Sequence, residues 1–136
     1  MAYWLVKSEP SVYSWEQFIK DKQTTWDGIR NYAARLHLLN MRKKDKVFFY
    51  HSNEGLEIVG IGEVFRESFA EDDNPVTKWV AVGLRAVKSL KKPVTLAEMK
   101  NHKMLSNMAL IRISRLSVSP ITEKEWGIIL TMSGEK

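Results

Sequence analysis

Two strand-like segments joined by a turn constrain the fold more than any other feature of this chain. Residues Val47–Ser52 begin with an apolar run that contains two phenylalanines and a tyrosine, a pattern typical of a buried strand. Asn53-Glu54-Gly55 is a turn-forming sequence, and Glu57–Phe65 follows with the composition of a second strand. Gly60 and Gly62 share one face of that strand, which predicts a tight bend or the close approach of another backbone or a ligand. The chain is therefore predicted to be built around a β-sheet.

Short helices are predicted to interrupt several further strands. Side-chain caps mark the helix starts Ser14, Asn31, Thr95 and Thr122. We expect the second of these helices to run to about Asn40 with Tyr32, Leu36 and Leu39 facing inward. The other expected strands are Tyr3–Val6, Trp79–Val87, Leu110–Ile113 and Leu116–Val118, and the expected loops are Thr24–Asn31 and Arg66–Thr77. This pattern predicts one α+β domain over residues 1–136, a small curved barrel with about four short helices, and not a parallel doubly wound sheet.

The composition excludes several kinds of chemistry. The chain has no cysteine, so disulfides, thiolate metal sites and cysteine nucleophiles are excluded. Its three histidines, His37, His51 and His102, fall on a helix, a strand and a loop, a spacing that predicts no metal site. Gly60-Ile61-Gly62 lacks the third glycine of a dinucleotide-binding loop, and no helix is expected after it. We therefore expect neither a metal nor another cofactor, and we assign no catalytic residue.

Charge and apolar runs indicate the compartment and the class of partner. No apolar run approaches the length of a membrane span, and Lys7 and Glu9 interrupt the first segment before a signal-peptide core can form. We expect a soluble, cytoplasmic protein (nuclear if its source is a eukaryote) with no membrane partner. The net charge of +5 fits a nucleic-acid partner and fits plain solubility equally well. The basic residues expected to contact phosphate are Arg42, Lys43, Lys44 and Lys46, with a solvated turn as the alternative.

Polar side chains gather where predicted elements end. In a small barrel such ends can converge on one mouth and place an aromatic wall beside hydrogen-bonding groups, which is what a flat base requires. The residues in question are Lys7, Ser8, Glu9, Trp26, Asp27, Arg30, Asn31, His51, Ser52 and Asn53. The alternative is that Trp26 belongs to the core and the polar groups cap turns. The spacing of these residues does not separate the two interpretations of Trp26.

Four segments of the chain together resemble the EVE domain family. They are Tyr3–Pro10, Thr25–Tyr32, Phe48–Asn53 and Arg115–Pro120, and they occur in the family's order over almost the whole chain. The resemblance implies a PUA-like fold, a small mixed barrel related to the YTH domains that read modified adenine in RNA. It also implies a reader of modified bases, with modified cytosine in DNA as the leading proposal.

The similarity to YTH domains assigns roles to individual positions. The Lys-Ser pair of their first strand matches Lys7 and Ser8, and the polar residue at the base edge matches Glu9. Their first cage tryptophan matches Trp26, and Asp27 matches the neighbour that offers a backbone carbonyl. The asparagine after their central strand matches Asn53. Their second cage aromatic lies in the loop that corresponds to Arg66–Thr77, where Phe69 is the only aromatic residue. The resemblance thus implies that these residues form the base-binding pocket. On this basis we expect Trp26 to be a stacking wall, so that its replacement by alanine leaves the fold nearly as stable.

Three functions follow as hypotheses. The first is a non-catalytic reader that takes a modified base out of the strand; Glu9, which only accepts hydrogen bonds when ionised, suits the exocyclic amine of cytosine. The second is an amidohydrolase of the ASCH type, which acts on acylated nucleosides with a lysine, a hydroxyl and a glutamate; Lys7, Ser8 and Glu9 supply these groups, but Ser8 points to the opposite side of the strand. The third is an interaction module whose binding is indifferent to base modification.

Overall fold

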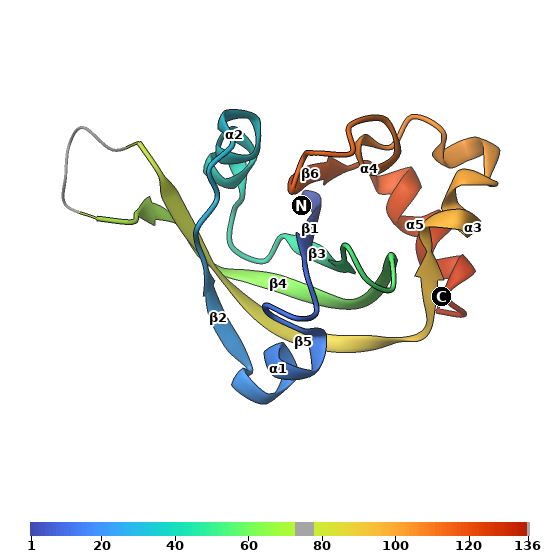
Figure 1. The fold of residues 1–136 in the computed structure, drawn as a ribbon, viewed down its shortest axis with the longest axis horizontal. Helices are drawn as coiled ribbons and strands as arrows, with labels where there is room; N and C mark the ends of the chain where they lie inside the picture. Colours follow the sequence, from blue (N-terminus) through green and yellow to red (C-terminus); the bar gives the residue numbers. More distant parts are fainter. Residues whose placement is uncertain (73–77, 136) are drawn as a thin grey trace.

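A curved sheet organises the part of the chain that the computed structural model describes, residues 1–72 and 78–135. The strands are β1 Tyr3–Ser8, β2 Gln23–Trp26, β3 Lys46–His51, β4 Glu57–Ala70, β5 Val80–Thr95 and β6 Val118–Ile121. Their order is β2-β5-β4-β3-β1-β6, so that β2 and β6 are the two edges and the barrel is not closed (Figure 1). β1 and β3 are parallel, and the other neighbours are antiparallel. The predicted α+β class and the hairpin of β3 and β4 are confirmed.

Five α-helices and one 3₁₀ helix accompany this sheet in the described residues, against the expected number of about four. They are α1 Trp15–Asp21, α2 Tyr32–Asn40, α3 Leu96–Lys100, η1 Lys103–Leu105, α4 Ala109–Arg112 and α5 Glu123–Met132. The predicted capping boxes at Thr95 and Thr122 are confirmed. Each threonine hydroxyl accepts the backbone N–H of a glutamate three residues later, and the carboxylate of that glutamate accepts the backbone N–H of the threonine. Local capping chemistry therefore determined where these helices begin.

Two apolar clusters lie on opposite faces of the sheet. Successive residues of a strand point to opposite faces, so Trp4 belongs to one cluster and Leu5 to the other. The first cluster is covered by α1 and α2, which contribute Phe18 and Leu38. The second cluster is covered by α3, α4 and α5, and Trp126 of α5 is among its members. The sheet is thus the middle layer of the protein, with helices on both faces (Figure 1).

Leu110, Ile111 and Arg112 belong to the helix α4, which Ile113 caps, so the expectation of a strand over Leu110–Ile113 was wrong. The backbone N–H of Arg112 donates to the carbonyl of Met108 at 3.0 Å, and that of Ile113 donates to Ala109 at 2.8 Å. These four-residue spacings close a helical turn and leave no donors for a neighbouring strand. An apolar run this short has no periodicity that separates the two structures.

The expected loop Arg66–Thr77 begins later than predicted. β4 continues to Ala70, and Phe69 is paired with Ala81 of β5. The pairing partner lies more than ten residues further along the chain, so composition alone could not reveal it. Residues 73–77 of this expected loop lie outside the described residues.

Both glycines of β4 stand at the close approaches that the sequence predicts. A Cβ on Gly60 would lie 2.1 Å from Cζ2 of Trp15, whereas a Cβ on Gly62 would lie 3.0 Å from the backbone carbonyl oxygen of Arg85 and 3.4 Å from the ring of Phe18. Both rings come from α1. The glycines therefore let α1 pack directly on the sheet, which positions the chain that leads into this helix.

Candidate nucleic-acid interface

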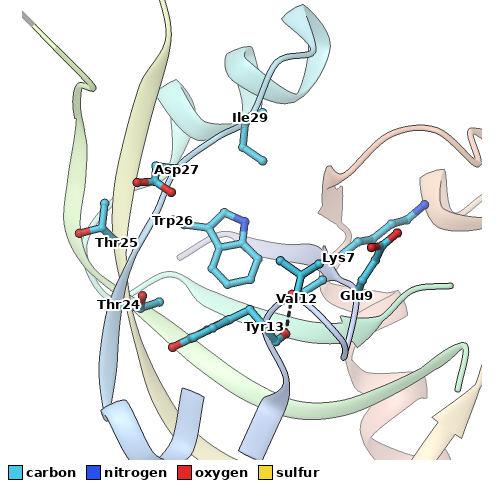
Figure 2. Close-up of a pocket in the computed structure, with 10 residues that line it drawn as sticks. Lys7, Glu9, Val12, Tyr13, Thr24, Thr25, Trp26, Asp27 and Ile29 are labelled. Carbon is cyan, nitrogen blue, oxygen red and sulfur yellow. Dashed lines mark hydrogen bonds between the residues drawn. The ribbon is translucent and has the colours of Figure 1, made fainter. Parts of the chain in front are cut away.

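An open hollow of about 470 Å³ lies between the end of β1, the chain that leads into α1, and β2 (Figure 2). Its volume is in the range of sites that hold small molecules. The hollow is lined by Lys7, Ser8, Glu9, Val12, Tyr13, Thr24, Thr25, Trp26, Asp27 and Ile29. Five of these, Lys7, Ser8, Glu9, Trp26 and Asp27, were assigned to a base pocket from the sequence. The structure therefore places them together, and their contact with a base stays a prediction.

Trp26 is the large aromatic side chain of the hollow. It is the last residue of β2 and not part of a loop, because Thr24, Thr25 and Trp26 favour strands and pair with β5. Its side chain is only 8% exposed, and its ring makes T-shaped contacts with Tyr13 at 6.2 Å and Phe49 at 5.7 Å between centroids. Trp26 therefore belongs to the first apolar cluster and borders the hollow at once, so the two interpretations of this residue are not exclusive.

The indole N–H of Trp26 differs from those of two neighbouring tryptophans. Trp4 donates its indole N–H to Asp45 at 2.9 Å, and Trp15 donates to Ser89 at 2.8 Å. Within residues 1–72 and 78–135, the Trp26 indole N–H has no such acceptor. Trp26 can therefore offer a ligand both a ring and a hydrogen-bond donor.

The wall below Trp26 is held by hydrogen bonds. Ser8 Oγ donates to the carbonyl of Tyr13 at 2.6 Å, and the Tyr13 hydroxyl donates to Asp21 at 2.8 Å. The Glu9 carbonyl accepts the backbone N–H groups of Val12 and Tyr13, each at 2.9 Å. Burial raises the pKa of the Tyr13 phenol, which keeps it a neutral donor. Tyr13 is thus fixed at both ends, whereas Val12 stands 77% exposed at the mouth of the hollow.

Lys7 and Glu9 line the hollow at the end of β1 and lie together on the side away from Thr25 and Asp27 (Figure 2). Lys7 Nζ donates to the carbonyl of Ser114 at 2.8 Å, and burial lowers the pKa of this amine. Glu9 is exposed, and its carboxylate accepts no hydrogen bond from the described part of the chain. The carboxylate is therefore available to a donor on a ligand.

The amidohydrolase alternative requires a lysine, a hydroxyl and a carboxylate that act together. Lys7 Nζ is directed to Ser114, while Ser8 Oγ is directed to the Tyr13 carbonyl. The two groups serve different parts of the fold, and Glu9 is bonded to neither. The strand alternation inferred from the sequence accounts for this separation.

His51, Ser52 and Asn53 are not among the residues that line the hollow, in contrast to their assignment from the sequence. His51 lies opposite Ser8 in the parallel pairing of β1 and β3, so the two strand ends do meet as expected. However, His51 Nε2 accepts the backbone N–H of Trp15 at 3.0 Å, and the start of α1 covers it. Ser52 donates its backbone N–H to the Ser8 carbonyl at 2.9 Å. His51 and Ser52 thus hold the start of α1 and the end of β1, which border the hollow.

Arg30 and Asn31 also lie outside the lining. Arg30 donates to both carboxylate oxygens of Glu71, at 2.7 and 3.0 Å, and Glu71 additionally accepts the backbone N–H of Gly28. The hydrogen bond from Arg30 holds the pKa of the Glu71 carboxyl below its usual value. Asn31 is the N-cap of α2 and accepts the backbone N–H of Ala34. Both residues fix the turn that follows Trp26.

Phe69, which the resemblance to YTH domains matches to a second cage aromatic, does not line the hollow either. It lies in β4, and the guanidinium carbon of Arg66 is 3.6 Å from its ring centroid. Because the expected loop is a strand at this point, Phe69 is held at a fixed register along β5. The second aromatic ring that borders the hollow is Tyr13 instead.

The segment Arg42–Lys46 is a turn built around a buried carboxylate and not a fully solvated loop. Asp45 is 3% exposed and accepts the indole N–H of Trp4 and the backbone N–H of Arg42. Lys46 pairs with Glu63 of β4, and this hydrogen bond holds the pKa of the Glu63 carboxyl below its usual value. Lys43 and Lys44 are exposed, so their contact with phosphate stays a prediction.

This basic turn lies at the opposite end of β1 from the hollow. Lys46 is paired with Tyr3, whereas the hollow begins at Lys7. A strand advances about 3.3 Å per residue, which separates the two by more than ~10 Å along β1. Lys43 and Lys44 therefore lie away from the hollow and do not border it.

Five further residues line the hollow that were not predicted from the sequence: Val12, Tyr13, Thr24, Thr25 and Ile29. The run Thr24-Thr25-Trp26 carried a usable signal, because all three residues favour strands. A strand at this position alternates its side chains, and Figure 2 shows Thr25 and Asp27 on the other side of β2 from the indole. Val12 and Ile29 carried no comparable signal.

Residues 1–72 and 78–135 contain no group of three or more His, Asp or Glu side chains that could hold a metal ion. Over the same residues, no helix has both the length and the apolar character that crossing a membrane requires.

The open α+β sheet and its hollow place this protein among PUA-like domains. Residues 2–132 match the EVE domain family, so the chain belongs to that family. Human thymocyte nuclear protein 1 is 34% identical to it, over 96% of this chain and 73% of the human protein. Rpa0253 from Rhodopseudomonas palustris, whose structure was solved by NMR, is 49% identical with a TM-score of 0.93, covering 98% and 94% of the two chains.

Two further solved structures are informative. Human THYN1 protein in complex with 5-methylcytosine containing DNA is similar with a TM-score of 0.88 and 31% identity, covering 100% of this chain and 99% of that one. ASCH from Zymomonas mobilis has a TM-score of 0.60 at 11% identity, covering 96% and 95% of the two chains. The second likeness shows the fold alone.

Proposed function

We propose that this chain is a non-catalytic reader of modified cytosine in DNA, which takes the base, turned out of its strand, into the hollow beside Trp26. The observation that carries the proposal is the juxtaposition of the Trp26 ring, its unpaired N–H within the described residues, and the available carboxylate of Glu9 around one hollow. A human relative of the same family has been crystallised with 5-methylcytosine containing DNA, which supports this class of ligand.

The energetics of this function are feasible. Taking a base out of the stack costs a few kcal/mol. Stacking on one aromatic ring recovers about 1–3 kcal/mol per base, and each buried methyl carbon adds about 1 kcal/mol. A methyl group alone therefore gives a preference of only several-fold, and the remaining selectivity has to come from hydrogen bonds at the base edge.

Glu9 supplies the hydrogen bond that distinguishes cytosine. An ionised carboxylate accepts and does not donate, so it fits the exocyclic amine of cytosine and opposes the carbonyl that uracil and thymine carry at the same position. Lys7, whose amine is held by Ser114, flanks Glu9 and offsets its charge in the hollow. The proposal thus assigns ring recognition to Trp26 and edge recognition to Glu9.

A competition experiment tests this function. A labelled oligonucleotide with one 5-methylcytosine is displaced from the protein by otherwise identical oligonucleotides that carry cytosine, 5-hydroxymethylcytosine or uracil. We expect the modified cytosines to compete best and uracil worst. The Trp26→Phe variant keeps a ring in the core but loses the N–H, and it should bind the modified base several-fold more weakly. Equal competition by all bases would instead indicate an interaction module.

The same protein preparation separates reading from turnover. The protein is incubated with N4-acetylcytidine, and the nucleoside is then followed by chromatography. We expect it to remain unchanged. Release of acetate at a rate that depends on protein concentration, and that is lost in Glu9→Gln, would overturn the assignment of a non-catalytic reader.

A further inference from the structure

A second aromatic surface lies outside the hollow, at the start of α2. Tyr32, the first residue of α2, stacks on Trp79 with 5.1 Å between ring centroids and 29° between ring planes. The guanidinium carbon of Arg30 lies 5.2 Å from the same Trp79 ring. Tyr32 is nevertheless 66% exposed. A large ring is therefore held in a fixed orientation while much of its surface faces solvent.

This arrangement is not explained by the core. The sequence predicted that Tyr32 faces inward with Leu36 and Leu39, but α2 buries Ala34 and Leu38 instead. Leu36 on the same helix is also exposed, at 54%. Trp79 supports one side of Tyr32, so the exposed area includes the other face of the ring. Tyr32 is thus a platform whose orientation is fixed before any ligand arrives.

The platform lies close to the hollow along the chain. Ile29 lines the hollow, and Tyr32 follows three residues later. Three residues span at most about 11 Å, even in a fully extended chain. Successive nucleotides of a DNA strand are about 3.4 Å apart along the helix axis. A strand whose base occupies the hollow therefore brings a base one to three nucleotides away within reach of Tyr32.

We propose that Tyr32, supported by Trp79, stacks on the base of a nucleotide that flanks the base held in the hollow. This inference rests on the proposed function and adds a second contact to it. Stacking on an aromatic face is tolerant of sequence, because every base has a π-face. The platform therefore contributes affinity for the strand and does not select the modification.

Charge favours a nucleic-acid strand over an apolar protein partner at this surface. Arg30 is already paired with Glu71, which holds it beside Trp79 and makes it part of the platform's support. The chain as a whole carries a net charge of +5, which attracts a polyanion. A flat exposed ring can stack on a base, whereas an apolar peptide would require a larger apolar groove than one exposed tyrosine.

Abasic oligonucleotides test the proposal directly. Binding of wild-type protein is measured to an oligonucleotide with one 5-methylcytosine, and to the same oligonucleotide with abasic sites at the neighbouring positions on one side or the other. We expect abasic sites on one side to weaken binding by about fivefold to a hundredfold, the range for loss of one stacked base. This measurement needs no variant and is independent of protein folding.

Three variants complete the cycle. Tyr32→Ala should lower affinity for the complete oligonucleotide by the same factor and should cause no further loss with the abasic oligonucleotide. Tyr32→Phe should bind like wild type, and Leu36→Ala, the matched exposed residue on α2, should have no effect. The preference for 5-methylcytosine over cytosine should be the same in Tyr32→Ala and wild type, because Tyr32 does not touch the modified base.

The possible failures are distinguishable. If wild type prefers 5-methylcytosine but Tyr32→Ala and the abasic sites reduce binding independently of each other, or not at all, the stacking role is overturned and the proposed function stands. If wild type shows no preference for the modified base, the proposed function is overturned, and the assignment of Tyr32 beside an inserted base is overturned with it.

Discussion

Trp26 and Trp126 are buried to the same extent but lie in very different surroundings. Trp126 is 7% exposed and Trp26 is 8% exposed. Trp126 stacks on Phe48 at 3.8 Å and on Tyr3 at 4.6 Å between centroids. Among the residues that the structure describes, the ring contacts of Trp26 are T-shaped, and Trp26 borders an open hollow. Burial alone therefore does not separate a structural tryptophan from one that can meet a ligand; what borders the ring does.

The two surroundings follow from how each face of the sheet is covered. The Trp126 face carries α3, α4 and α5, whose side chains form a continuous apolar cluster. The Trp26 face carries α1 and α2, with the end of β1 and the residues before α1 between them (Figure 1). Glycines in β4 allow α1 to approach the sheet closely on that face. The hollow is left beside β2, at the edge of the sheet.

Truncation of each tryptophan gives the largest expected effect. Trp126→Ala and Trp26→Ala should each lower the free energy of unfolding by about 3–5 kcal/mol, the usual cost of removing a large buried side chain. Denaturant unfolding followed by far-UV circular dichroism measures this cost. This expectation replaces the one drawn from the sequence, in which Trp26 is a wall that the fold can lose. Measured where both variants are folded, only Trp26→Ala should lose the preference for 5-methylcytosine. A Trp26→Ala protein with unchanged stability would show that its ring contributes little to the core.

Local chemistry explains which parts of this structure could be predicted from the sequence. The hairpin turn at Asn53-Glu54-Gly55 and the capping boxes at Thr95 and Thr122 depend on residues a few positions apart, and they were predicted correctly. The extension of β4 to Ala70 depends on pairing with β5 across a distant part of the chain. No local pattern encodes such a partner.

The candidate site shows the same limit. Trp26 and Glu9 were placed at one hollow through a resemblance over several segments, and the lining includes both. His51 was assigned to the same mouth because its strand ends beside that of Ser8, which is correct as far as the pairing goes. The start of α1 then covers it through Trp15. Which face of a strand end stays open depends on the packing of another element, and this was not predictable from spacing.

Glu9→Gln should produce the next largest effect. The amide adds a donor where only acceptors stood, so discrimination between cytosine-type and uracil-type bases should fall by about 1–3 kcal/mol. Stability should not change, because Glu9 is exposed and its carboxylate supports nothing in the described fold. Glu54→Gln, at an exposed position in the hairpin turn, is the matched control for loss of charge. Unchanged discrimination in Glu9→Gln would remove Glu9 from the base edge.

Replacing the exposed lysines of the turn before β3 should have a smaller effect, which is visible in the salt dependence of the affinity for an oligonucleotide. Lys43→Ala with Lys44→Ala should flatten the log–log dependence of affinity on salt by about 0.7 per lost contact with a single-stranded phosphate. Lys46 is left intact because it pairs with the buried Glu63. Lys100→Ala with Lys103→Ala removes the same amount of charge from α3 and η1, on the face of the sheet that carries Trp126. This pair should leave the slope unchanged.

The length of the oligonucleotide sharpens this prediction. The basic turn lies at the far end of β1 from the hollow, so the contribution of Lys43 and Lys44 should disappear when the oligonucleotide is shortened to the modified nucleotide and its immediate neighbours. A flattened slope with the shortest oligonucleotide would mean that the two lysines contact the strand at a different place from the one proposed.

The smallest expected effect concerns pH and the support behind the hollow. Burial lowers the pKa of His51 from its ordinary value of 6.5, although Glu57 and Glu16 act in the opposite direction. The folded protein therefore holds His51 neutral where the unfolded chain already binds a proton, so the free energy of unfolding decreases as pH falls below about 6.5. A protonated His51 also loses the lone pair that accepts the Trp15 N–H. Glu63 and Glu71 also have lowered pKa values, and their protonation destabilises the fold only at more acidic pH than that of His51.

Denaturant unfolding at a series of pH values between about 8 and 5 measures the histidine contribution. His51→Gln keeps an acceptor for the Trp15 N–H and does not titrate, so its stability should vary less across this range. Burial lowers the pKa of His37 as well, and His37→Gln serves as the control that retains the His51 contribution. If His51→Gln loses stability with falling pH as steeply as wild type, His51 is not the group that couples the start of α1 to pH.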